Sequence, residues 1–115
     1  MTDRMIGLDQ YVEQHVQECM HELARLCNQP SISSQGLGMQ ECAALVAELL
    51  RSRGIAAQVM QTAGYPVVVG EYGTGERTLL LYNHYNVQPP KPLNLWDSPS
   101  LSSADPSSFS PATAR

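Results

Sequence analysis

The residues best suited to chemistry follow an apolar run in the second half of the chain. The run Leu79–Leu81 lacks alternation, as expected for a strand covered on both faces, and His84 comes shortly after it. Imidazole is the commonest neutral metal ligand, and ligands of open α/β sheets gather at the carboxyl ends of strands. Asn86 would point to the same side as His84 if the strand continued. The spacing therefore indicates a metal ligand with a polar neighbour, although His84 taken alone is more simply a hydrogen-bonded histidine at a strand end.

Two helices are predicted ahead of this segment. From Leu8 to about Gln29 the apolar residues recur at spacings of three and four, which is typical of one face of an amphipathic helix. Pro30 should end this helix, and the small polar stretch 31–38 should form a loop. A second helix is expected at about Met39–Arg53, followed by Gly54 in the left-handed cap position.

The chain then changes period, which predicts strands. The candidates are Ile55–Met60, Pro66–Tyr72 and Thr78–Asn83, and the short glycine-bearing loop Gly73–Arg77 predicts a β-hairpin between the last two. Two helices followed by a mixed sheet with covered strands predict an α/β fold built in layers.

Composition excludes several kinds of partner. The net charge is -4, with 11 acidic residues against 7 scattered basic ones, so neither nucleic acid nor an anionic membrane surface is expected to bind. Cys19, Cys27 and Cys42 all fall within apolar helical patterns, which predicts buried, reduced thiols and a reducing compartment. No signal peptide is recognisable and no apolar run is long enough to cross a bilayer, so a cytoplasmic protein is expected.

The segment around His84 also carries a family resemblance. The runs His84–Pro89 and Trp96–Pro99 resemble the first metal-binding motif of the zinc-dependent metallopeptidase family of acetylornithine deacetylase, succinyl-diaminopimelate desuccinylase, aminoacylase and carnosinase. The Val-Gln-Pro within it is similar to the dipeptidase-like members. The helix end and loop at Leu26–Ser33 fit the same pattern, so the resemblance covers about residues 8–99.

The resemblance implies the chemistry of a zinc pair that activates a bridging water to attack an amide carbonyl. His84 would ligate one of the two ions. The family has an aspartate two residues later, which orients the histidine ring and raises its basicity. This chain has Asn86 at that position, and an amide carries no charge, so the resemblance implies an impaired catalytic position.

The family's remaining ligands and its general base would lie further along the chain. After Trp96 the only acids are Asp97 and Asp105, and no histidine follows. We therefore interpret residues 1–97 as the N-terminal part of a zinc-peptidase-like catalytic domain, truncated. It would be a fragment of a hydrolase of dipeptides or N-acyl amino acids, inactive alone and without stably bound zinc.

Residues 98–115 form a serine- and proline-rich stretch that is expected to be disordered, and an out-of-frame tail would explain the abrupt change in composition. A competing hypothesis is a small non-catalytic α/β module that associates, with itself or with a partner, through its exposed sheet edge.

Other residues of chemical interest have simpler interpretations. His15 and Cys19 have a helical spacing that could hold a metal, but a packing role is favoured. His21 is expected on a solvated face. The glycines that follow Pro66 lie between two strands, so they do not predict a dinucleotide site. Tyr85 is a candidate for lining a cleft.

Overall fold

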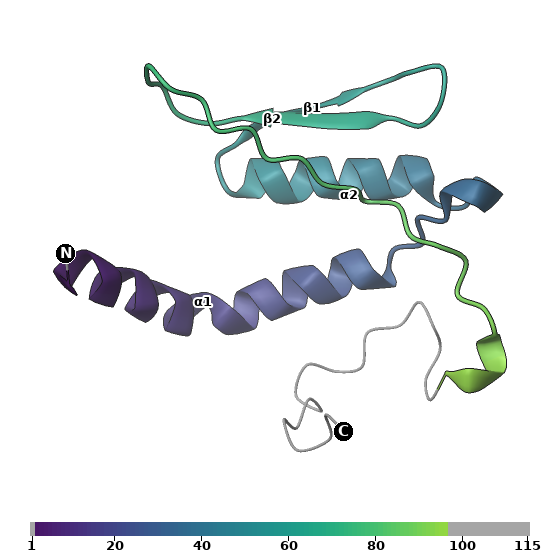
Figure 1. The fold of residues 1–115 in the computed structure, drawn as a ribbon, viewed down its shortest axis with the longest axis horizontal. Coiled ribbons are helices and arrows are strands. Elements are labelled where there is room, and N and C mark those ends of the chain that lie inside the picture. Colours follow the sequence, from purple (N-terminus) through teal and green to yellow (C-terminus); the bar gives the residue numbers. More distant parts are fainter. Residues whose placement is uncertain (1, 97–115) are drawn as a thin grey trace.

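The computed structural model describes residues 2–96, so the predicted tail at 98–115 lies outside the described residues. Two helices are followed by two strands and an extended segment (Figure 1). The elements in chain order are α1 (Thr2–Asn28), a 3-10 turn (Ser33–Gln35), α2 (Met39–Ser52), β1 (Ala56–Met60), β2 (Val67–Glu71) and a second 3-10 turn (Leu93–Leu95). This confirms the predicted α/β class.

Both predicted helices are present, and glycine sets the boundaries of the second. α1 begins at Thr2 rather than Leu8, and α2 ends one residue before the predicted limit. Gly54 follows with φ +77°, the left-handed conformation expected of it. Gly38 precedes α2 with φ +71°, and a Cβ at this position would overlap the carbonyl oxygen of Pro30. The loop between the helices therefore depends on the absence of a side chain at Gly38.

The sheet differs from the predicted one. β1 and β2 pair antiparallel, with Ala56 opposite Glu71 and Met60 opposite Val67, so they form the hairpin. The predicted hairpin between β2 and Thr78–Asn83 is wrong, as is the predicted third strand. An apolar run forms a strand only where another strand offers hydrogen-bonding partners, and residues 2–96 offer none to this run.

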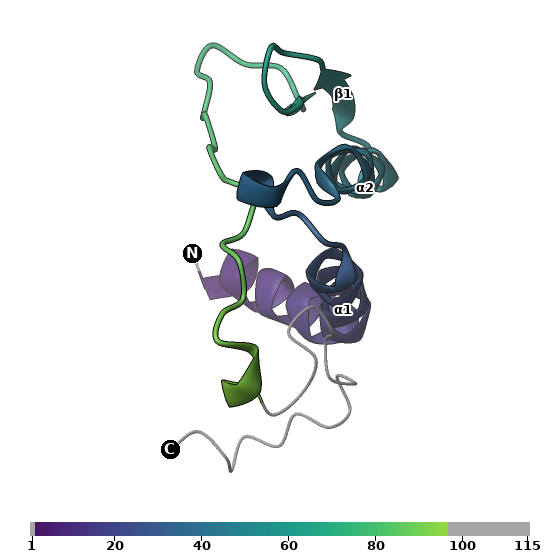
Figure 2. The ribbon, with the colours of Figure 1, turned by 90° about the vertical axis from the view of Figure 1, so that its right-hand side faces the viewer.

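The core lies between the hairpin and α2. Cys42, Ala43 and Ala47 are fully buried on α2, and both strands of the hairpin contact this helix. A Cβ at Gly70 of β2 would meet side-chain atoms of Ile55 and Leu50 at 3.0 and 3.3 Å. The hairpin therefore packs directly on one side of α2, and α1 lies on the other (Figures 1 and 2).

Much of the apolar face of α1 is exposed. With 27 residues against 14, α1 is about 40 Å long and α2 about 21 Å, so the N-terminal half of α1 extends past its neighbour (Figure 1). Val12 is 61% exposed, and Cys19 and Cys27 are exposed as well. The prediction of three buried thiols is therefore wrong for these two cysteines and holds only for Cys42.

Ion pairs join the two helices where they meet. The guanidinium of Arg53 lies 2.8 Å from Glu22 and 3.5 Å from Glu18, and Arg25 lies 2.9 Å from Glu48. The hydrogen bond that Arg53 donates to Glu22, together with the charges of the Glu18 and Glu22 carboxylates, raises the pKa of Arg53. Ion pairs therefore contribute to the contact between α1 and α2. Within residues 2–96, no helix has the length and apolarity to cross a membrane.

Candidate functional site

The predicted site residues lie on the extended segment that follows β2. This segment leaves the hairpin, passes α2 and reaches the turn that precedes α2 (Figures 1 and 2). His84 is exposed on it, rather than held at the end of a buried strand as predicted. Its ring makes an edge contact with Tyr82, with centroids 5.3 Å apart, and its Nε2 atom lies 3.4 Å from the Tyr82 hydroxyl. The segment presents the imidazole to solvent.

The residues after His84 are held by residues 31–33, which we call the serine loop. The amide of Val87 donates to the carbonyl oxygen of Ser31 at 2.9 Å, and the Ser31 hydroxyl donates to the carbonyl oxygen of Tyr85 at 2.8 Å. The side-chain amide of Asn86 donates to the hydroxyl oxygen of Ser33 at 3.1 Å. Ser31 is only 3% exposed, so this contact is shielded from water. The serine loop therefore fixes the chain directly behind the candidate ligand.

Asn86 consequently does not orient the histidine ring in this structure. Its amide group is directed to Ser33, and no hydrogen bond joins it to His84. The roles that the family resemblance implies for His84 and Asn86 stay predictions.

Tyr85 and Cys42 form a half-buried polar contact behind the serine loop. The Tyr85 hydroxyl donates to the carbonyl oxygen of Pro66 at 2.6 Å, and the Cys42 thiol lies 3.9 Å from the carbonyl oxygen of Tyr85. Burial raises the pKa of the Cys42 thiol, although its hydrogen bond with Ser31 acts in the opposite direction. Burial, and then the nearby Cys42, raises the pKa of Tyr85. Both groups therefore stay protonated and serve as donors.

A shallow hollow of about 440 Å³ lies beside Asn86. Its lining residues come from the loop between the helices, the start of α2, the turn before β2 and the extended segment: Ser33, Ser34, Met39, Tyr65, Pro66, Tyr85 and Asn86. Tyr85 thus lines a hollow, as predicted. The lining carries hydroxyl and amide groups but no acid or base, so it could bind a small polar group without activating it.

A metal site needs more ligands than this segment supplies. Structural zinc takes four ligands, and catalytic zinc takes three protein ligands and a water. Within residues 2–96 no three histidine, cysteine, aspartate or glutamate side chains lie close enough together to hold an ion. His15 instead stacks on Tyr11 and lies with Nδ1 2.7 Å from its carbonyl oxygen. The described residues do not fit a zinc pair, since they place one imidazole at the site.

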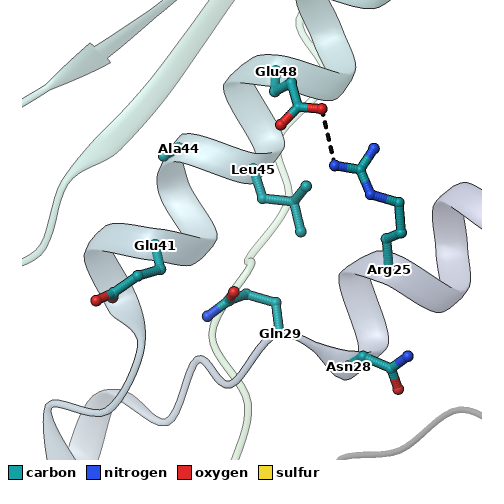
Figure 3. A pocket seen from close by; sticks show the side chains of 7 residues that line it. All are labelled: Arg25, Asn28, Gln29, Glu41, Ala44, Leu45 and Glu48. Carbon is teal, nitrogen blue, oxygen red and sulfur yellow. Dashed lines mark hydrogen bonds and ion pairs between the residues drawn. The ribbon is translucent and has the colours of Figure 1, made fainter.

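A second hollow, of about 620 Å³, lies between the helices and away from His84. Figure 3 shows its lining, with the Arg25–Glu48 ion pair at one end. The residues that line it are Arg25, Asn28, Gln29, Glu41, Ala44, Leu45 and Glu48. It contains no histidine or cysteine, and its two carboxylates are on α2.

Comparison with known proteins supports the class of fold and site. An M20 family metallo-carboxypeptidase from Sulfolobus solfataricus matches 76% of this chain at 33% sequence identity, with a TM-score of 0.69. The chain spans 21% of the length of that protein. No protein family model matches the sequence, and no curated protein does either.

The architecture is therefore that of a part of an M20 peptidase domain. The match supports the assignment of this chain to the M20 metallopeptidase superfamily, a group of metal-dependent hydrolases.

The sequence predicts the segment but not the residues that anchor it. Ser31 and Ser33 fall in the predicted loop at 31–38, and the structure places both against the residues that follow His84. The signal available in the sequence was the Pro-Ser-Ile-Ser run at residues 30–33, which is part of the family resemblance.

Proposed function

We propose that this chain carries the first metal-ligating segment of an M20-type hydrolase, with His84 as the ligand. The substrates would be dipeptides or N-acyl amino acids, and the metal would be zinc. Both follow from the resemblance of this sequence to the dipeptidase-like members of the family. The observation that carries the proposal is the structural match to a metallo-carboxypeptidase at 33% identity. The contact between the serine loop and residues 85–87 supports it, because it fixes the backbone directly behind His84.

The proposal assigns no hydrolysis to residues 2–96 alone. One imidazole is too few protein ligands for a catalytic zinc, and the lining of the adjacent hollow offers no general base. Further ligands would have to come from other parts of such a domain. The purified chain, supplied with zinc and a dipeptide, is therefore expected to hydrolyse the dipeptide no faster than the uncatalysed reaction in the same buffer.

A chimera tests the class of activity. Residues 1–96 would replace the equivalent part of an active M20 metallopeptidase, and hydrolysis and bound zinc would be measured. Asn86→Asp should raise activity about 10- to 100-fold, because it restores the charged neighbour of the histidine. His84→Ala should abolish activity and lower the zinc content. His21→Ala, an exposed histidine on α1, is the matched control and should change neither.

The outcome of the His84 variant decides the proposal. If the His84→Ala chimera binds zinc and turns over substrate like its parent, His84 is not a ligand. If the unmodified and Asn86→Asp chimeras both fold but neither hydrolyses any dipeptide or N-acyl amino acid, the proposed substrate class is wrong.

A further inference from the structure

Tyr85 is held at two places, by its main chain and by the end of its side chain. Its carbonyl oxygen accepts a hydrogen bond from the Ser31 hydroxyl at 2.8 Å, and the Cys42 thiol lies 3.9 Å from the same oxygen. Its own hydroxyl donates to the carbonyl oxygen of Pro66 at 2.6 Å. The side chain is half-buried, whereas the neighbouring His84 is exposed. Tyr85 therefore connects the segment that carries the candidate ligand both to the serine loop and to the turn before β2.

The turn that offers the Pro66 carbonyl is itself fixed. Pro66 is buried and directly precedes Val67, the first residue of β2. The Thr62 hydroxyl donates to the carbonyl oxygen of Tyr65 at 2.8 Å, and the Tyr65 hydroxyl donates to the carbonyl oxygen of Ser33 at 2.5 Å. The turn is thus joined to the serine loop as well as to the hairpin. The Tyr85 hydroxyl therefore bonds to a point that is held in place from both sides.

We infer that Tyr85 is a positioning residue, which sets the direction in which the chain presents His84 through the hydrogen bond from its hydroxyl to Pro66. With the Tyr85 carbonyl held by Ser31, the main chain can still rotate about the Cα–C bond of Tyr85, one of its two soft dihedrals. Such a rotation would move the phenol ring and the peptide unit of His84 together, because both are attached to the same Cα. The bond to Pro66 opposes it at the far end of a rigid ring that has only two rotatable bonds.

The direction set in this way is away from the serine loop. Successive side chains of an extended segment point to opposite sides, so Tyr85 directed to Pro66 leaves His84 on the other side, where it is exposed. The importance of this direction rests on the proposed function, in which His84 is a ligand. The contact itself involves neither metal nor substrate, so the full chain can be tested by itself.

NMR relaxation of the full chain measures the effect of Tyr85→Phe, which removes the hydroxyl and keeps the ring. The amide of Tyr85 lies in the same peptide plane as the Cα of His84, so its order parameter reports on the atom that carries the imidazole side chain. We expect this order parameter to fall from about 0.85, the value of a rigid backbone, to below about 0.6. Tyr72→Phe is the matched control: it removes the same atom from a side chain that is 80% exposed and should leave the order parameter unchanged.

Amide hydrogen exchange in the β1–β2 hairpin separates positioning from a purely structural role. A hydroxyl that only stabilised the fold would speed exchange across the hairpin when removed and leave the order parameter of the Tyr85 amide unchanged. That result would overturn the inference, and so would a Tyr85→Phe chain that does not fold or an equal drop in Tyr72→Phe. A wild-type order parameter already below about 0.6 would overturn it without any variant. None of these results bears on the proposed hydrolysis, which the His84→Ala chimera tests separately.

Discussion

Replacing Ser31 with alanine should release the segment that carries His84. The Ser31 hydroxyl is buried and donates to the carbonyl oxygen of Tyr85 at 2.8 Å. Without it, that carbonyl retains only the Cys42 thiol at 3.9 Å, which is a weak donor. Loss of a buried hydrogen bond that leaves an acceptor poorly satisfied costs about 1–2 kcal/mol. We expect Ser31→Ala to lower the free energy of unfolding by that amount.

Two measurements together locate the effect. Denaturant unfolding gives the change in free energy, and amide hydrogen exchange reports on the Val87 amide, which donates to the carbonyl oxygen of Ser31. A loss of 1–2 kcal/mol should speed exchange of that amide about 5- to 30-fold. Ser52→Ala is the matched control: its hydroxyl donates to the carbonyl oxygen of Leu49 at 2.7 Å but is exposed, so the change should stay within about 0.5 kcal/mol. Equal losses for the two variants, or unchanged exchange at Val87, would refute the reasoning.

Two further predictions concern the glycine turns and the buried thiol. Gly38→Ala should cost at least about 3 kcal/mol in unfolding free energy, because a Cβ there overlaps a backbone carbonyl, whereas Gly54→Ala meets open space and should cost only about 1–2 kcal/mol. Equal costs in thermal or denaturant unfolding would contradict this difference. Burial raises the pKa of Cys42, so the unfolded chain loses this proton first and the free energy of unfolding should fall as pH rises above about 8.5. Denaturation at a series of pH values should show that the free energy of unfolding falls less steeply with pH for Cys42→Ala than for the wild-type chain. An identical slope for the two would contradict a raised pKa at Cys42.

Local patterns in the sequence determined the helices and the identity of the candidate ligand. The spacing of apolar residues predicted both helices, and Gly54 predicted the end of the second, because helix periodicity and caps depend on neighbouring residues. The candidate ligand His84 is likewise predicted from the types and order of the residues around it. The structural match to an M20 peptidase supports that interpretation of the motif at the level of the superfamily.

Tertiary structure alone decided which strands pair and which surfaces are covered. The run at residues 79–81 has the composition of a buried strand, yet β2 pairs with β1 and the run stays exposed. Cys19 and Cys42 occupy similar helical patterns, but of the two only Cys42 is buried, against Ser31 and Tyr85. The contact of the serine loop with Tyr85 joins residues 54 positions apart. Burial and strand pairing depend on which distant segments meet, and hydrophobic periodicity shows which face of an element is apolar without showing what covers it.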